Sequence, residues 1–124
     1  MATLGYATVG SNRLTEAKAF YDALLGSAGF APMFEHPSGG RIYGKEGSLV
    51  FGVLGPYDGR QATVGNGSMF AFRFDTPEEV QAFHAKALAL GSKDEGAPGE
   101  RGPKMYFSYF RDLDGNKLCA FSMG

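Results

Sequence analysis

Few side chains in this sequence of 124 residues could act as nucleophiles, bases or metal ligands, because it contains one cysteine and two histidines. Cys119 could serve as a thiol nucleophile only with a base in reach, and no histidine shares its face on the strands that we predict beside it. We therefore expect Cys119 to be a small packing residue. A single cysteine also excludes an intrachain disulfide and a thiolate-rich zinc site.

The histidines and carboxylates do not indicate a catalytic group. His84 lies on the apolar stripe of a predicted helix, where we expect it to pack. His36 ends a predicted strand beside Pro37, where we expect it to be exposed. Nine of the thirteen carboxylates fall at predicted turns, helix starts or loops: Glu35, Glu46, Asp75, Glu78, Glu79, Asp94, Glu95, Asp112 and Asp114. Such positions indicate caps and solvated charge rather than acid–base catalysis.

Two segments have apolar residues at helical spacing, which predicts helices over residues 14–25 and 77–90. The stripes are Ala17, Phe20, Tyr21, Leu24 and Leu25 in the first, and Val80, Phe83, His84, Ala87 and Leu88 in the second. Each segment ends at a glycine. Thr76 and Glu79 predict a capping box at the start of the second helix, with Pro77 at its first position.

The rest of the chain alternates between short apolar runs and turn residues. Strands are predicted at residues 4–10, 30–36, 41–45, 48–54, 68–74, 104–111 and 117–122, with a weaker one at 92–96. Hairpin turns are predicted at 38–40, 46–47 and 112–116. Segment 96–104 has glycine at every third residue but is too short for a collagen triple helix, so we expect an extended, mobile loop that could act as a lid.

The order of these elements repeats after a shift of 63 residues, which places Phe20 on Phe83 and Leu25 on Leu88. The sequence therefore predicts an α+β fold with two βαβββ units, at about residues 1–60 and 64–124, in a single domain of residues 1–124. One such unit cannot bury its sheet face alone. We expect the two units to pair into a curved mixed sheet around a central cleft, where a ligand would bind.

Composition excludes several classes of partner. Twelve basic residues against thirteen acidic ones leave a net charge of −1, so there is no basic surface for nucleic acid. The apolar runs are far shorter than a membrane span requires, and the first residues lack the features of a signal peptide. We expect a cytoplasmic protein that binds neither nucleic acid nor a membrane.

Four segments carry a family resemblance: EAKAFYDALL (16–25), FAFRFDTPEEVQAFHAKALALG (70–91), DEGAPG (94–99) and RDLDGNKLCAF (111–121). Together they resemble the vicinal oxygen chelate superfamily, which contains glyoxalases, bleomycin-resistance proteins and extradiol dioxygenases. The resemblance covers nearly the whole chain and implies the duplicated βαβββ fold. It implies no single activity, because this scaffold carries lyases, isomerases, dioxygenases and drug-sequestering proteins.

In metal-using members, the resemblance implies ligands on the first, fifth and eighth strands that hold a divalent ion against paired substrate oxygens. These positions fall on Tyr6, Met69 and Cys119, none of which is a usual ligand for Zn, Ni, Mn or Fe. The fourth strand adds a ligand in glyoxalases but offers none here: Val50, Phe51, Gly52, Val53 and Leu54. A shift of one residue gives no better set: Gly5, Ala7, Ser68, Phe70, Leu118 and Ala120. We therefore predict no metal and no cofactor.

Strand alternation and the resemblance together give nine residues that would line the cleft: Tyr6, Thr8, Met69, Ala71, Arg73, Tyr109, Lys117, Cys119 and Phe121. The register of the seventh strand decides whether Tyr106, or Phe107 with Tyr109, belongs to this wall.

A surface of this composition suits an organic ligand with a flat body and an anionic group. Arg73 is informative, because an inward-facing guanidinium needs a partner. Asp75, Tyr6 or an anion of the ligand could provide it.

We predict a protein that lacks the usual metal ligands and binds a small organic molecule in the cleft, as bleomycin-resistance proteins do. The alternative is a metal-dependent lyase or dioxygenase, similar to lactoylglutathione lyase or the extradiol enzymes, acting on a substrate with vicinal oxygens. A subunit without any ligand is a third possibility. We also predict a homodimer, because proteins that this chain resembles commonly dimerise and open sheet edges favour pairing.

Overall fold

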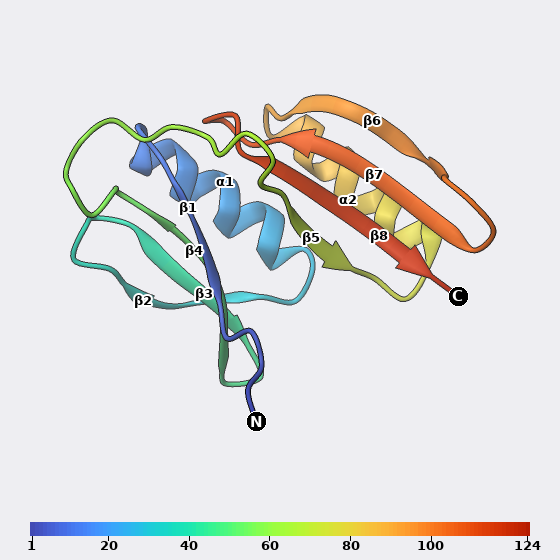
Figure 1. Cartoon of the computed structure of the whole chain (residues 1–124), viewed down its shortest axis with the longest axis horizontal. Helices are drawn as coiled ribbons and strands as arrows, with labels where there is room; N and C mark the ends of the chain where they lie inside the picture. The colour runs from blue at the N-terminus through green and yellow to red at the C-terminus, as the bar shows by residue number, and fades with distance from the viewer. The chain divides into compact units, whose positions relative to one another are not determined.

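A computed structural model describes all 124 residues, which divide into two compact units, residues 1–63 and 64–124. Each unit contains one helix and one four-stranded mixed sheet (Figure 1). The predicted α+β class is thereby confirmed. The pairing of the two units around a central cleft stays a prediction. Neither helix is long and apolar enough to cross a membrane.

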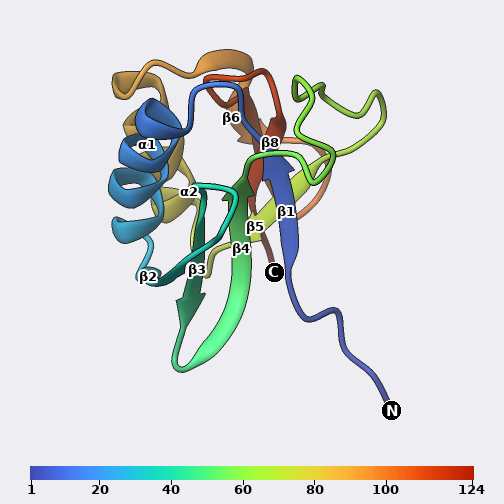
Figure 2. The same cartoon turned by 90° about the vertical axis from the view of Figure 1, so that its left-hand side faces the viewer.

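The first unit contains β1 (Ala7–Gly10), α1 (Leu14–Gly26), β2 (Ala31–Glu35), β3 (Arg41–Lys45) and β4 (Ser48–Leu54). The strand order is β1-β4-β3-β2, with β1 parallel to β4 and the other neighbours antiparallel. Figure 2 shows α1 along one face of this sheet and residues before β1 extending away from it.

Aromatic packing joins α1 to its sheet. The buried ring of Tyr21 lies 5.2 Å from that of Phe51 and 6.4 Å from that of Tyr43. The predicted two-residue hairpin at 46–47 joins β3 to β4, and both Glu46 and Gly47 take positive φ there.

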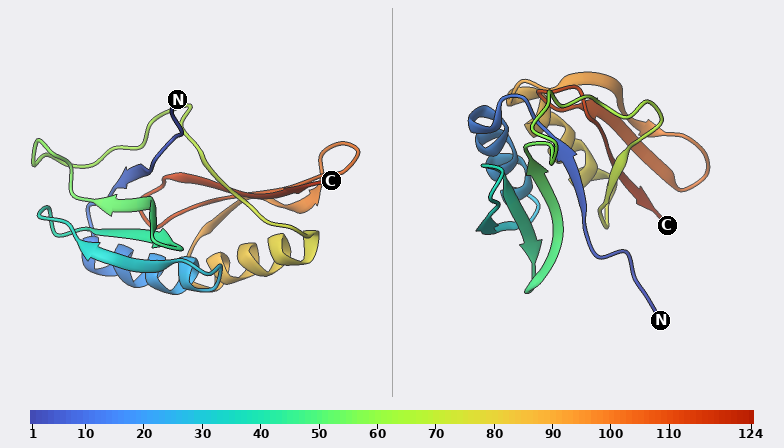
Figure 3. Two further views of the ribbon diagram at one scale, coloured as in Figure 1. Left: turned by 90° about the horizontal axis from the view of Figure 1, so that it is seen from below. Right: turned by 60° about the vertical axis from the view of Figure 1, so that its left-hand side comes forward.

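The second unit contains β5 (Phe70–Arg73), α2 (Pro77–Ala89), β6 (Lys93–Glu100), β7 (Met105–Arg111) and β8 (Lys117–Met123). The strand order is β5-β8-β7-β6, with β5 parallel to β8 and the other neighbours antiparallel. Figure 3 shows α2 along one face of this sheet.

The start of α2 has the predicted capping box. The Thr76 hydroxyl accepts from the Glu79 amide, and the Glu79 carboxylate accepts from the Thr76 amide, so two helix-end donors are satisfied. Farther along the helix, the ring of Phe83 lies 5.7 Å from that of Phe72 and 6.0 Å from that of Phe110. The helix is therefore fixed to β5 and β7.

The glycine-rich segment 96–104 differs most from its predicted structure. We predicted a loop over 96–104, but β6 continues to Glu100 and pairs with β7. The register shifts between Asp94 and Gly96 and again between Gly96 and Gly99, so the extra residues are taken up as bulges. Glycines and a proline suit such an irregular edge strand, which explains why the strand signal was weak.

Candidate functional site

The second sheet has two different faces. On one, Phe72 and Phe110 pack against α2. The pairings Ala71↔Cys119, Arg73↔Phe121, Tyr109↔Cys119, Phe107↔Phe121 and Arg111↔Lys117 place the alternate residues on the other side. We call this the open face, defined by Ala71, Arg73, Phe107, Tyr109, Lys117, Cys119 and Phe121. Six of the nine predicted site residues therefore share one surface, and Met69 directly precedes β5 beside it.

Three aromatic rings of the open face are stacked. The Phe107 ring lies 5.0 Å from that of Phe121 with an interplanar angle of 14°, and 6.3 Å from that of Tyr109 with an angle of 24°. The register of β7 therefore places Phe107 and Tyr109, and not Tyr106, on the open face. Tyr106 points the other way, and its hydroxyl accepts a hydrogen bond of 2.7 Å from Gln81 on α2.

Cationic side chains lie over these rings. The Lys117 ammonium is 5.2 Å and the Arg101 guanidinium 5.9 Å from the centre of the Tyr109 ring. Arg73 lies 6.0 Å from the centre of the Phe121 ring. None of the three cations forms an ion pair with a carboxylate. The face is therefore both aromatic and positively charged.

Arg101 is a residue that sequence reasoning missed, because it lies in the segment read as a loop. Its side chain folds back along β6 and donates 2.8 Å to the Ala97 carbonyl. A Cβ on Gly99 would lie 2.9 Å from its Nη1, and one on Gly96 would lie 3.0 Å from the Tyr109 ring. Gly96 and Gly99 were the sequence signal that could have indicated this arrangement, because glycines leave room for a long side chain beside the strand.

The expected partners of Arg73 are not the observed ones. We expected Asp75, Tyr6 or a ligand anion, but neither protein residue pairs with it. Its guanidinium instead donates to the Met123 carbonyl at 3.4 Å and lies over Phe121. Arg73 is also exposed, so it needs no buried counter-charge.

Cys119 is fully buried, and its burial raises the pKa of the thiol to about 11. The nearby charges of Lys117 and Arg101 lower this pKa but do not offset the desolvation. The thiol is therefore neutral at physiological pH, which fits a packing residue better than a nucleophile.

The remaining predicted residues lie at or near β1 in the first unit. Tyr6 precedes the strand and is 52% exposed, because pairing with β4 begins only at Ala7. Thr8 is exposed and pairs with Gly52. Similarly, Met69 precedes β5 and is 43% exposed. Tyr6 and Met69 therefore lie just outside the strands in which we predicted them.

Comparisons with known proteins identify the family. The family model of the Glyoxalase/Bleomycin resistance protein/Dioxygenase superfamily matches residues 3–120. A crystal structure of a glyoxalase/bleomycin resistance protein from Albidiferax ferrireducens is 40% identical and covers 99% of this chain and 100% of its own, with a TM-score of 0.89. The chain belongs to this superfamily. The resemblance drawn from the sequence is thereby confirmed.

More distant superfamily structures share the fold alone. A family enzyme from Burkholderia phytofirmans is 20% identical, covers 99% of this chain and 100% of its own, and has a TM-score of 0.78. A lactoylglutathione lyase from Agrobacterium tumefaciens is 20% identical, covers 98% of this chain and 94% of its own, and has a TM-score of 0.73. A search of curated proteins found no match.

The residues at the positions that the family resemblance implies for metal ligands do not fit a metal ion. A phenol, a thioether and a thiol stand there, at Tyr6, Met69 and Cys119, and the raised pKa of Cys119 opposes the thiolate that a metal would need. Elsewhere in the chain, no group of three or more His, Cys, Asp or Glu side chains lies close enough to hold a metal.

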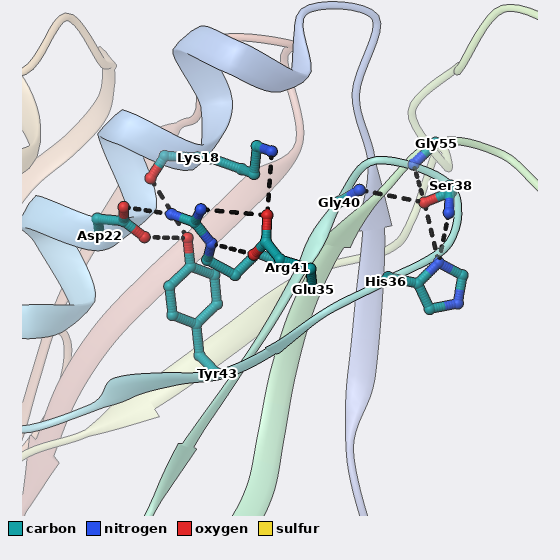
Figure 4. A network of polar contacts seen from close by, with 9 residues as sticks. All are labelled: Lys18, Asp22, Glu35, His36, Ser38, Gly40, Arg41, Tyr43 and Gly55. Carbon is teal, nitrogen blue, oxygen red and sulfur yellow. Dashed lines mark hydrogen bonds and ion pairs between the residues drawn. The ribbon is translucent and has the colours of Figure 1, made fainter.

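Both histidines lie away from the open face. His84 is buried as expected, with its ring 5.6 Å from that of Phe110 and its Nε2 3.2 Å from an Asp94 carboxylate oxygen. His36 is only partly exposed, contrary to expectation. Its Nδ1 accepts from the Ser38 amide and lies 2.9 Å from the Ser38 hydroxyl, which draws the ring into the β2–β3 turn (Figure 4).

A second polar cluster joins α1 to the first sheet (Figure 4). The Arg41 guanidinium donates to the carboxylates of Asp22 and Glu35, and the Tyr43 hydroxyl donates to Asp22 at 2.7 Å. The hydrogen bond from Arg41 lowers the pKa of Glu35, whereas burial raises that of Tyr43. Because these groups satisfy one another, the cluster is structural.

Proposed function

We propose that this protein binds a small, flat organic molecule on the open face and uses no metal to do so. The observation that carries the proposal is the stack of Phe121, Phe107 and Tyr109 with unpaired cations above it. All three rings are partly exposed, so a planar ligand could extend the stack. An offset aromatic pair contributes about 0.5–1.5 kcal/mol beyond its buried area.

We also propose the remaining ligand-binding residues, the cellular location and the oligomeric state that the sequence predicts. Tyr6, Thr8 and Met69 are further ligand-binding residues in this proposal. The protein would act in the cytoplasm as a homodimer, because β5 and β6 leave open edges on the second sheet. Sedimentation equilibrium would test the dimer directly.

The alternative, a metal-dependent lyase or dioxygenase, finds no support in the side chains at the metal positions. It makes a clear prediction of its own, because it requires stoichiometric binding of Ni, Zn, Mn or Fe(II). Calorimetric titration with each ion would detect such binding, and micromolar affinity or better would contradict the metal-free proposal.

The direct test is calorimetric titration with flat aromatic compounds, including naphthamide. Removing one stacking partner by Tyr109→Ala should weaken binding by about 1 kcal/mol, which is roughly fivefold in Kd. Tyr57→Ala is the matched control, because Tyr57 is a fully exposed tyrosine in the other unit. Absence of binding by every flat compound, or equal affinity of both variants, would refute the proposal.

A further inference from the structure

A cavity of about 600 Å³ lies beside the open face, within the second unit. The segment of residues 64–69 forms one side of it, and Arg111 and Lys117 form the other. Met69 and Lys117 belong both to this cavity and to the set of predicted site residues. A molecule stacked on the aromatic rings could therefore reach into the cavity.

The charged side chains that line the cavity are both cationic, Arg111 and Lys117. Neither Asp nor Glu is among its lining residues. Lys117 forms no ion pair, and its ammonium is held only over the Tyr109 ring. Its donors therefore remain available for an acceptor on a ligand.

Arg111 is held in position without being neutralised completely. Its Nε donates 2.7 Å to Glu95 and its Nη1 donates 3.1 Å to the Gly115 carbonyl, whereas no partner is found for Nη2. The hydrogen bond from Arg111 lowers the pKa of Glu95, so that carboxylate stays ionised and keeps the guanidinium oriented. A guanidinium fixed at two donors loses little freedom when it binds an anion.

Neutral donors complete the lining at Asn66 and Ser68. The backbone that presents them requires glycine. Gly67 has a φ of +112°, and a Cβ on Gly65 would lie 2.5 Å from the Ser68 hydroxyl oxygen. The segment is therefore shaped to bring polar side chains to this cavity.

Two further cations lie over the rings of the open face. Arg73 and Arg101 bring the number of cations at the open face and the cavity to four, with Arg111 and Lys117. Glu95 forms an ion pair with one of them, Arg111. The whole chain nevertheless carries a net charge of −1. Of these four cations only Arg111 is paired with a carboxylate, so the others would attract an anion.

We infer that the ligand is a planar organic anion, with its flat body on the aromatic stack and its carboxylate or phosphate in the cavity between Lys117 and Arg111. This inference rests on the proposed function and names the ligand class. Charge-assisted hydrogen bonds to such a group are stronger than neutral ones.

The test compares compounds with one flat body and different end groups: naphthoate, naphthyl phosphate and the neutral naphthamide. Calorimetry at neutral pH and low salt should show at least one of the anions binding about tenfold more tightly than the amide. The ratio of the two anions distinguishes a carboxylate from a phosphate ligand. Lys117→Gln should abolish most of this preference, measured as the ratio of anion to amide affinity within the same variant, whereas Lys117→Arg should keep it. Lys86→Gln is the matched control, because it removes the same charge from α2.

Each outcome decides a different question. Equal affinity for the amide and both anions would overturn the inference and leave the proposed function standing, whereas no binding by any compound would overturn both. A preference for anions that survives Lys117→Gln would overturn the placement of the charged group in this cavity.

Discussion

Truncation of Phe83 to alanine should destabilise the second unit strongly. Its side chain is 2% exposed, and its ring lies 5.0 Å from that of Phe74 as well as close to Phe72 and Phe110. The change removes the contact that fixes α2 to the sheet behind the open face. Phe→Ala substitutions at buried sites cost about 3–5 kcal/mol, because both transfer free energy and packing are lost.

This loss should be visible in urea denaturation followed by circular dichroism. With a slope of about 1.5 kcal/mol per M, the midpoint should fall by about 2–3 M. Phe83→Leu keeps most of the apolar volume and should lose much less. Leu88→Ala is the control on the same helix, because Leu88 is 38% exposed and should change stability by less than about 1 kcal/mol.

The reasoning would be refuted if Phe83→Ala shifted the midpoint no more than Leu88→Ala. That result would mean that the aromatic cluster does not hold α2 in place. A change in slope without a change in midpoint would also count against it, because the predicted effect is a loss of packing.

Three further predictions concern the cap, the ion pair and the thiol. Thr76→Ala should lower the free energy of unfolding by about 1 kcal/mol in urea titrations, whereas Thr15→Ala, which removes no cap bond, should change it little. Because Arg41 lowers the pKa of Glu35 in the folded state, their pairing stabilises the fold above the ordinary value of 4.5 and is lost as pH falls through the lowered pKa. Stability measured from neutral to acid pH should therefore fall less steeply in Arg41→Gln than in the unaltered protein, and an unchanged slope would contradict this. The buried thiol of Cys119, with its pKa of about 11, should resist iodoacetamide at neutral pH and react faster as pH rises, whereas the urea-unfolded chain should react readily.

Much of the fold could be predicted because its signals are local. Helical spacing located α1 and α2, and Thr76 with Glu79 marked the start of α2. The predictions failed where pairing between strands decides the structure. The β6 strand was read largely as a loop, because bulges at its glycines hide the alternation that its pairing with β7 imposes.

The site was only partly predictable for the same reason. Alternation along β5 and β8 correctly grouped Arg73 with Phe121, since residues two apart share a face. Alternation could not predict the position of Arg101. Its side chain lies over the Tyr109 ring because the bulges in β6 change the course of that strand. Nor could alternation find the cavity, because residues 64–69 and Arg111 are distant in sequence.

The sequence by itself determined the class of the fold, its internal repeat and the side chains at the metal positions, because these depend on residue type and short-range spacing. Only the tertiary structure decided that Phe107 rather than Tyr106 joins the aromatic stack and that unpaired cations gather around it. Register and side-chain path arise from pairing between distant strands, and no local pattern specifies them.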